Sequence, residues 1–487
     1  MPSFPATVRT TAILLLAATF FGCATFRSYN AELNQTLSLA GAGKVDAAIN
    51  LLERTNRRGK KDLLYYFELG ELERLRNRYE ESRKAWMEAD ALVQAWESTA
   101  AVNPEKLVSS MTSVLINDKG RPYEGHDYEK VMLTTRLALD HLARGDFETA
   151  RVDIKRTHER ETVVAGLREK EFRKTEEEAR KRGVQTGFKE LNGYPVQSID
   201  NPEVNALRNS YQSAFSHYLA GFVYEALGEP SLAAAGYRKA IELQPDKPLL
   251  EQGLAGLDAR VGARDDGYTD VLFVVESGTA PARVSQQFNV PFPHQNRMLI
   301  VPVSFPVIMP AQPVYMPAEL QIQGENPIDI VAVTSIDLMA RKALQEEMPG
   351  IVLRGMIRST AKAVAQSQAG KNDESGLIAF AMVIGSLITE SADERGWRSL
   401  PAQIAIARAR MPSGEHTITL QTPEGVRSVQ LKLAGRYTVV GLRLLRSELF
   451  VQSPGRPAID ARAAPAESTD RRPETLEQQP RTMETSK

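Results

Sequence analysis

The feature that most constrains this fold is a repeated pattern of small and aromatic residues in the first half of the chain. The clearest unit runs from Tyr211 to Pro245. Small residues at fixed positions let two antiparallel helices approach closely, and aromatic residues fill the space that remains. The patterned positions are Gly221, Tyr224, Gly228, Ala233, Tyr237, Ala240 and Pro245. The pattern predicts an array of stacked helical hairpins.

Further units lie at Leu63 to Val93 and, more weakly, at Gly43 to Glu53 and Leu137 to Thr157. Their small helix residues recur at about 34 residues, the period of tetratricopeptide repeats. In the second unit, the residues at the repeated positions are Gly70, Ser82, Trp86 and Ala89. We therefore predict a tetratricopeptide-like α-helical solenoid over residues 23–261. Glycine and proline predict an inserted loop near residues 117–125.

After a short polar linker at residues 262–268, alternating apolar residues and frequent prolines predict a β-rich, sandwich-like domain over residues 269–452. The chain is therefore expected to be multidomain, and we expect the two domains to separate. Residues 336–391 predict a helical insertion, and the polar segment 453–487 predicts a disordered tail. The expected strands are Asp270–Glu276, Arg297–Ile308, Ala402–Arg408, His416–Gln421, Ser428–Leu433 and Tyr437–Leu445.

The N-terminus has the pattern of a lipoprotein signal peptide over residues 1–22. Arg9 precedes an uncharged apolar run that is too short to span a bilayer, and Gly22 stands directly before the only cysteine, Cys23. A single cysteine excludes an internal disulfide, so lipid attachment is the favoured role for its thiol. The alternative is an ordinary signal peptide with an incidental cysteine. Because Ala24 is not aspartate, resemblance to bacterial lipoproteins implies a lipid anchor at the periplasmic face of the outer membrane.

Several segments together resemble an uncharacterised family of tetratricopeptide-containing bacterial lipoproteins, whose genes often neighbour that of a penicillin-binding-protein activator lipoprotein. The resemblance covers most of residues 23–451 and implies this architecture and a role in the cell envelope. The matching residues are Asn117, Asp118, Arg121 to Tyr123, Gly125, Tyr128 to Val131, Glu276 to Gly278, Pro281, Glu390, Ala392, Asp393, Arg395, Trp397, Leu400, Pro401, Pro412 and Gly414 to His416.

Composition and motifs argue against several functions. The formal charge of −1 gives no overall field that would draw the chain onto nucleic acid. The histidines form no metal-ligand pair, so neither a metal nor another cofactor is expected. Ser359 and Lys362 spell a nucleophile motif, but no Lys-Thr-Gly sequence follows them. The chain is therefore expected not to be an enzyme.

The residues proposed to contact a partner stand in the inserted loop and where the helical insertion returns to the sandwich. They are Asn117, Asp118, Tyr123, Asp393, Arg395 and Trp397. The alternative for Arg395 and Trp397 is that they pin this return by a salt bridge and by packing.

We expect a protein-binding scaffold in cell-envelope or peptidoglycan-related assembly. It would capture an envelope protein or peptide on the concave face of its repeats, through exposed side chains of the first helix of each pair. The alternative function is an envelope enzyme or a saccharide-binding protein that acts through the β-rich domain.

Overall fold

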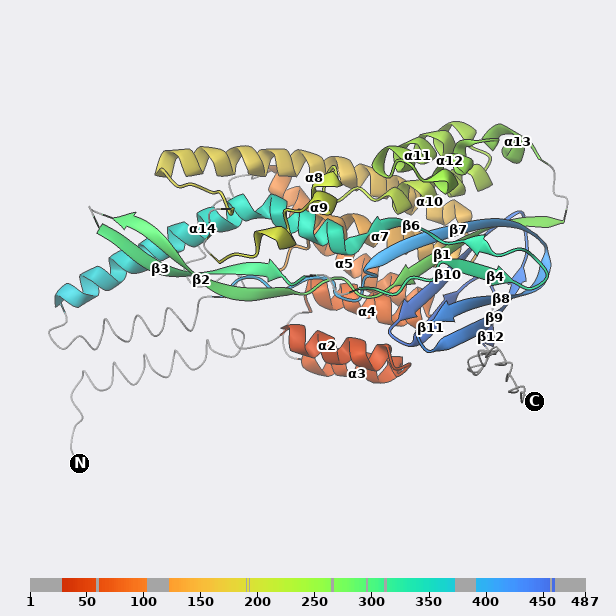
Figure 1. Ribbon diagram of the computed structural model, residues 1–487, viewed down its shortest axis with the longest axis horizontal. Helices are drawn as coiled ribbons and strands as arrows, with labels where there is room; N and C mark the ends of the chain where they lie inside the picture. Colours follow the sequence, from red (N-terminus) through yellow and green to blue (C-terminus); the bar gives the residue numbers. More distant parts are fainter. Residues whose placement is uncertain are drawn as a thin grey trace, which may run out of the picture.

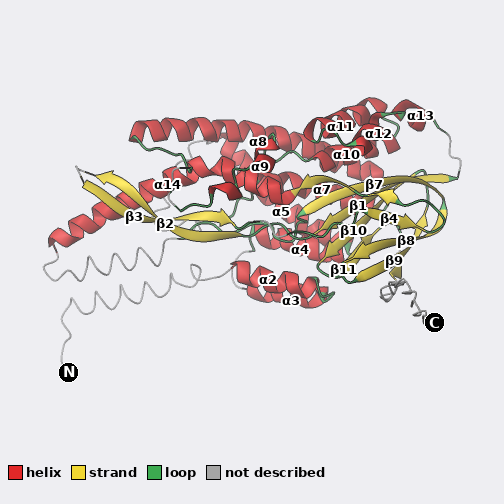
Figure 2. Ribbon diagram, in the orientation of Figure 1, coloured by secondary structure: helices red, strands yellow, loops and turns green. Residues whose placement is uncertain are grey.

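The computed structural model consists of an N-terminal helical region followed by a C-terminal β-rich region (Figures 1 and 2). No helix in the described part of the chain is both long and apolar enough to cross a membrane. The described residues are 29–57, 61–102, 122–189, 191, 193–263, 267–294, 297–310, 313–372, 391–455 and 458–459.

The described helices of this region form four hairpins: α2 with α3, α4 with α5, α7 with α8, and α10 with α11. Shorter helices follow α8 and α11. The bounds are α2 Tyr29–Ala40, α3 Val45–Thr55, α4 Leu63–Leu75, α5 Tyr79–Val102, α7 Asp127–Leu142, α8 Phe147–Arg182, α9 Pro202–Ala206, α10 Ala214–Ala226, α11 Pro230–Leu243, α12 Pro248–Leu254 and α13 Leu257–Gly262.

Two hairpins close in the same way, through a glycine on the first helix and an aromatic ring on the second. A Cβ atom at Gly70 would lie 2.2 Å from the indole of Trp86, and one at Gly221 would lie 2.6 Å from the ring of Tyr237. Because neither glycine has a side chain, the rings pack directly against the helix backbone. The small and aromatic positions singled out in the sequence therefore set the helix spacing.

The β-rich region has two five-stranded sheets and a long two-stranded ribbon, β2–β3. One sheet has the order β11-β10-β1-β7-β6, with β1 and β10 parallel, and the other has the order β12-β9-β8-β4-β5. The bounds are β1 Tyr268–Ser277, β2 Arg283–His294, β3 Arg297–Ile308, β4 Glu319–Ile322, β5 Ile328–Asp329, β6 Val331–Ser335, β7 Gln403–Pro412, β8 Gly414–Thr422, β9 Gly425–Leu433, β10 Tyr437–Leu445, β11 Glu448–Gln452 and β12 Ala458–Ile459.

The first sheet is buried on both faces, because successive strand residues point to opposite sides. On β1, Val271 and Phe273 pack against the second sheet, whereas Leu272 and Val274 join the core formed with the helices. The molecule therefore has three layers: helices, a central sheet and an outer sheet. Burial on both faces also explains the unbroken apolar run from Val271 to Val275 within β1.

Ion pairs cross the contact between the helices and the central sheet. Arg136 on α7 donates to Glu71 on α4 and to Glu276 on β1. Arg408 on β7 pairs with Glu225 on α10 at 2.7 Å. Because a buried charge is costly without a partner, these pairs fix how the sheet sits on the helices.

The structure differs from the expectation of a partner groove on the first helix of each hairpin. In two hairpins the first helix, α7 or α10, is buried on almost every side by neighbouring helices, the central sheet and α14. Exposed side chains of these helices therefore cannot form the expected partner groove, because the β-rich region of the same chain covers them.

The predicted insertion begins at the expected residue. Its described part contains the helix α14 Ile336–Asn372, which carries Pro349 inside it and packs on α7, α8, α9 and β3. Residues 373–390 lie outside the described residues. At the other end, β12 pairs with β9, so the ordered chain extends into the predicted tail.

Candidate functional site

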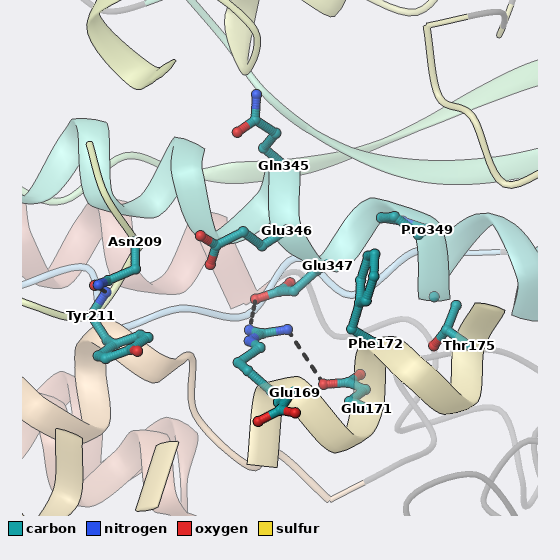
Figure 3. A pocket seen from close by; sticks show the side chains of 12 residues that line it. Glu169, Glu171, Phe172, Thr175, Asn209, Tyr211, Gln345, Glu346, Glu347 and Pro349 are labelled. Carbon is teal, nitrogen blue, oxygen red and sulfur yellow. Dashed lines mark hydrogen bonds and ion pairs between the residues drawn. The ribbon is translucent and has the colours of Figure 1, made fainter. Parts of the chain in front are cut away.

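The candidate site is a cleft of about 460 Å³ between α8 and α14, bounded at one end by the loop that precedes α10 (Figure 3). Phe172 rises from α8 toward Pro349 on α14, and Tyr211 lies at the opposite end. Phe172 is 55% exposed, so its ring is accessible to a ligand in the cleft. The cleft therefore offers an accessible aromatic wall.

The cleft is strongly acidic, since four glutamates and one arginine line it. Arg168 is already engaged: it donates to Asp127 and pairs with Glu171 at 3.4 Å and with Glu347 at 3.6 Å, as the dashed lines of Figure 3 show for the two glutamates. Glu171 and Glu347 are therefore paired within the wall, and Glu169 pairs with Arg173 at 3.8 Å, which leaves Glu346 as the lining glutamate that has no ion-pair partner among the described residues.

Glu346 is the carboxylate least well compensated. Burial raises the pKa of Glu346, although the hydroxyl of Ser210 donates to it at 2.7 Å and Arg168 attracts it. One turn away, Pro349 lacks an N–H group and leaves the carbonyl of Gln345 without its usual helical donor. These acceptors suit a ligand that brings hydrogen-bond donors and positive charge.

A second pocket of about 160 Å³ adjoins the cleft and shares Arg168, Glu171 and Glu347 with it. It lies at the N-terminus of α7, where His126 Nδ1 is 3.1 Å from Glu347 and its Nε2 is 3.1 Å from the carbonyl oxygen of Arg395. Both ring nitrogens are therefore engaged, which holds the imidazole in place.

Glu347 connects three elements at this pocket. Arg283 on β2 donates to Glu347 at 2.6 Å, and His126 and Arg168 approach from the helices. Burial alone would raise the pKa of Glu347, but Arg283, His126 and Arg168 together hold this pKa well below its usual range. Glu347 is consequently a fixed anion that joins α14 to α7, α8 and β2.

The structure brings together three of the residues predicted from sequence. The guanidinium of Arg395 lies 5.2 Å from the ring centroid of Tyr123 and pairs with Asp393 at 2.7 Å. Tyr123 in turn donates to Glu129 at 2.5 Å. Tyr123 and Asp393 both line the second pocket, so segments far apart in the sequence meet there.

Trp397 is placed differently from the other predicted residues. Its ring is fully buried and stacks on Phe67 with 4.3 Å between centroids, and its backbone N–H donates to Glu129 at 2.6 Å. This is the packing role that the sequence left open as the alternative to partner contact. Asn117, Asp118 and Cys23 lie outside the described residues.

Three residues that organise the site were not predicted from the sequence: Arg168, Arg283 and Glu347. Each is an ordinary charged residue in its own segment, and only their convergence marks them. The described residues contain no group of three metal-ligating side chains. The backbone of Ser359 and Lys362 belongs to α14, and their side chains lie outside the described atoms.

No family model matches the chain, and a search of curated proteins finds no match either.

Proposed function

We propose that this chain is a lipoprotein, anchored through Cys23 at the periplasmic face of the outer membrane, that acts as a protein-binding scaffold in cell-envelope assembly. The cleft between α8 and α14 is the binding site. The observation that carries the proposal is its exposed Phe172 beside Glu346, whose carboxylate has no ion-pair partner among the described residues. The function is binding rather than catalysis.

The chemistry of the cleft suggests what the partner presents. An aromatic wall and the carboxylate of Glu346 suit a lysine or arginine side chain next to an apolar one. The occupant is then a basic segment of an envelope protein or peptide.

The helical hairpins have a supporting role in this proposal. We infer that they are tetratricopeptide-like repeats, since Gly70 with Trp86 and Gly221 with Tyr237 make the same contact in two hairpins. Their first helices hold the β-rich region and α14 in place, which creates the cleft.

Site-specific photocrosslinking in cells tests the proposal. A photoreactive amino acid replaces Phe172 in the cleft or, as a control, Val152, which lies on the same helix and is equally exposed at 55%. We expect a discrete crosslinked partner from position 172 and none from position 152. Equal capture at both positions, or none at either, would contradict a binding cleft.

Charge reversal in the cleft provides a second test of the proposal. Glu346→Lys should reduce capture by the photoreactive residue at position 172, whereas Glu176→Lys, an exposed site on α8 outside the cleft lining, should not. If partner capture through the intact chain persists unchanged with Glu346→Lys, the site lies elsewhere. The β-rich region of the alternative function would then be the next place to search.

A further inference from the structure

A separate cavity of about 660 Å³ lies where α2 meets the end of β1 and the turn between β10 and β11. It shares no lining residue with the cleft or with the pocket beside it. Its lining includes Asn34, Ser277, Gly278, Tyr315, Arg398 and Arg446. Nothing in the proposed scaffold function uses this cavity.

Arg398 is a buried cation without an ion-pair partner among the described residues. Its side chain is almost inaccessible, and its Nε donates to the carbonyl of Ala280 at 3.0 Å. The two terminal nitrogens reach only the amide oxygens of Asn30 and Asn34, at 3.3 and 3.4 Å. These neutral and rather long contacts do not neutralise a guanidinium.

The carboxyl group of Glu68 lies nearby but does not neutralise the charge of Arg398. Glu68 accepts from the backbone N–H of Arg398 at 2.7 Å, and burial raises the pKa of Glu68 to about 7. Burial also lowers the pKa of Arg398, although the attraction of Glu68 acts to raise it. The local environment therefore holds more positive charge than its own carboxyl groups balance.

Two further arginines lie near the cavity. Arg443 is buried, donates to the carbonyl of the lining residue Gly278 at 2.6 Å, and is attracted by Glu276 and Glu71, although its Nε has no hydrogen-bond partner among the described residues. Arg446 lines the opening from the β10–β11 turn, with its aliphatic stem packed against Gly41. Against the two lining arginines stands one lining carboxylate, Glu424.

We propose that this cavity binds the oxyanion of a small organic ligand, a phosphate or a carboxylate, through the guanidinium groups of Arg398 and Arg446. Arginine donors form strong, directional hydrogen bonds to such groups. The volume lies in the range of small-molecule sites and leaves room for an organic body beyond the charged group.

Isothermal titration calorimetry on the full chain tests this site. Glycerol 3-phosphate and glycerate are the probes, each titrated at an ionic strength held constant with sodium chloride. We expect saturable binding of at least one probe, and the stronger of the two identifies phosphate or carboxylate as the preferred group. Absence of saturable binding by both probes at millimolar concentration overturns the proposal.

Matched variants assign the binding to the cavity. Loss of one charged hydrogen-bond donor should weaken binding about tenfold or more in Arg398→Gln, and Arg446→Gln should also weaken it. Arg238→Gln, an exposed arginine on α11 that lines none of these cavities, should bind as the wild type does. If Arg398→Gln fails to fold, the exposed Arg446→Gln decides the test. Wild-type affinity in Arg446→Gln, or equal weakening in Arg238→Gln, contradicts a site in this cavity.

Discussion

Individual buried carboxyl groups in this protein respond to their surroundings in opposite ways. Glu68 on α4 is fully buried beside an arginine that is not paired with it, and its pKa rises to about 7. Glu347 on α14 is surrounded by Arg283, His126 and Arg168, which hold its pKa well below the usual range. As pH increases, ionisation of Glu68 therefore destabilises the folded state, whereas ionisation of Glu347 stabilises it.

Glu68→Gln should make the protein more stable above pH 7. Because the folded-state pKa of Glu68 lies above 4.5, the folded state binds more protons, and its stability falls as pH rises from 4.5 to 7. A neutral amide removes this loss, which at pH 8 amounts to roughly 3 kcal/mol at most. Urea unfolding at pH 5 and pH 8 measures the free energy of unfolding of the wild type and the variant. A difference between these two free energies that is the same at both pH values would contradict the prediction.

Glu347→Gln should show the opposite pH dependence. The depressed pKa stabilises the folded state above pH 4.5, and this contribution is lost as pH falls through the folded-state pKa. Breaking a buried pair costs about 3 kcal/mol at neutral pH. In denaturant titrations the difference in unfolding free energy between wild type and Glu347→Gln should disappear at acidic pH. The control Glu176→Gln, at an exposed position on α8, should have almost the wild-type unfolding free energy at every pH.

At the scale of helices, glycine acts in two distinct ways. Gly221 on α10 lets the ring of Tyr237 lie against the backbone, whereas Gly166 on α8 has no atom within 4 Å of where a Cβ would stand. The first glycine is required for packing between helices. The second occupies an exposed helix position where a side chain would be tolerated.

Alanine at these two positions should therefore change stability in opposite directions. Gly221→Ala forces a methyl group into the ring of Tyr237 and should cost about 1 to 3 kcal/mol. Gly166→Ala should stabilise the helix by up to about 1 kcal/mol, because alanine is the better helix former. Thermal unfolding followed by circular dichroism at 222 nm distinguishes the two. Equal effects of both substitutions would show that the close approach at Gly221 does not control stability.

At the scale of the molecule, the helical and β-rich regions share a hydrophobic core. It includes Phe67 and Phe222 from helices together with Leu272, Trp397 and Tyr437 from the β-rich region. Phe222 and Tyr437 meet edge to face, with 5.6 Å between ring centroids. This shared core argues against the expectation that the two regions separate as independent domains.

Cleavage in the linker should consequently leave the protein assembled. After limited proteolysis between Gly262 and Gly267, the two fragments should elute together in native size-exclusion chromatography and separate only in denaturant. Calorimetry of the uncut chain should give one unfolding transition. Fragments that separate under native conditions would restore the view of two independent domains.

The sequence by itself determined most of the local structure, because local structure follows from periodicity and from residue type. The glycine and aromatic spacing predicted the α10–α11 hairpin, and alternation predicted β3 and β10 with the bounds that the structure has. The strands β2, β4, β5, β6, β11 and β12 were not predicted, and all of them except β2 are short strands that carry little periodic signal.

Only the tertiary structure decided what those elements face. No pattern within a single segment shows that the β-rich region covers α7 and α10, which removes the groove expected on the repeats. The candidate site was likewise only partly predictable. Tyr123, Asp393 and Arg395 carried a signal, whereas Arg168, Arg283 and Glu347 became part of a site through contacts between distant segments. Periodicity records which face of an element is buried, but the partner of that face depends on packing across the whole chain.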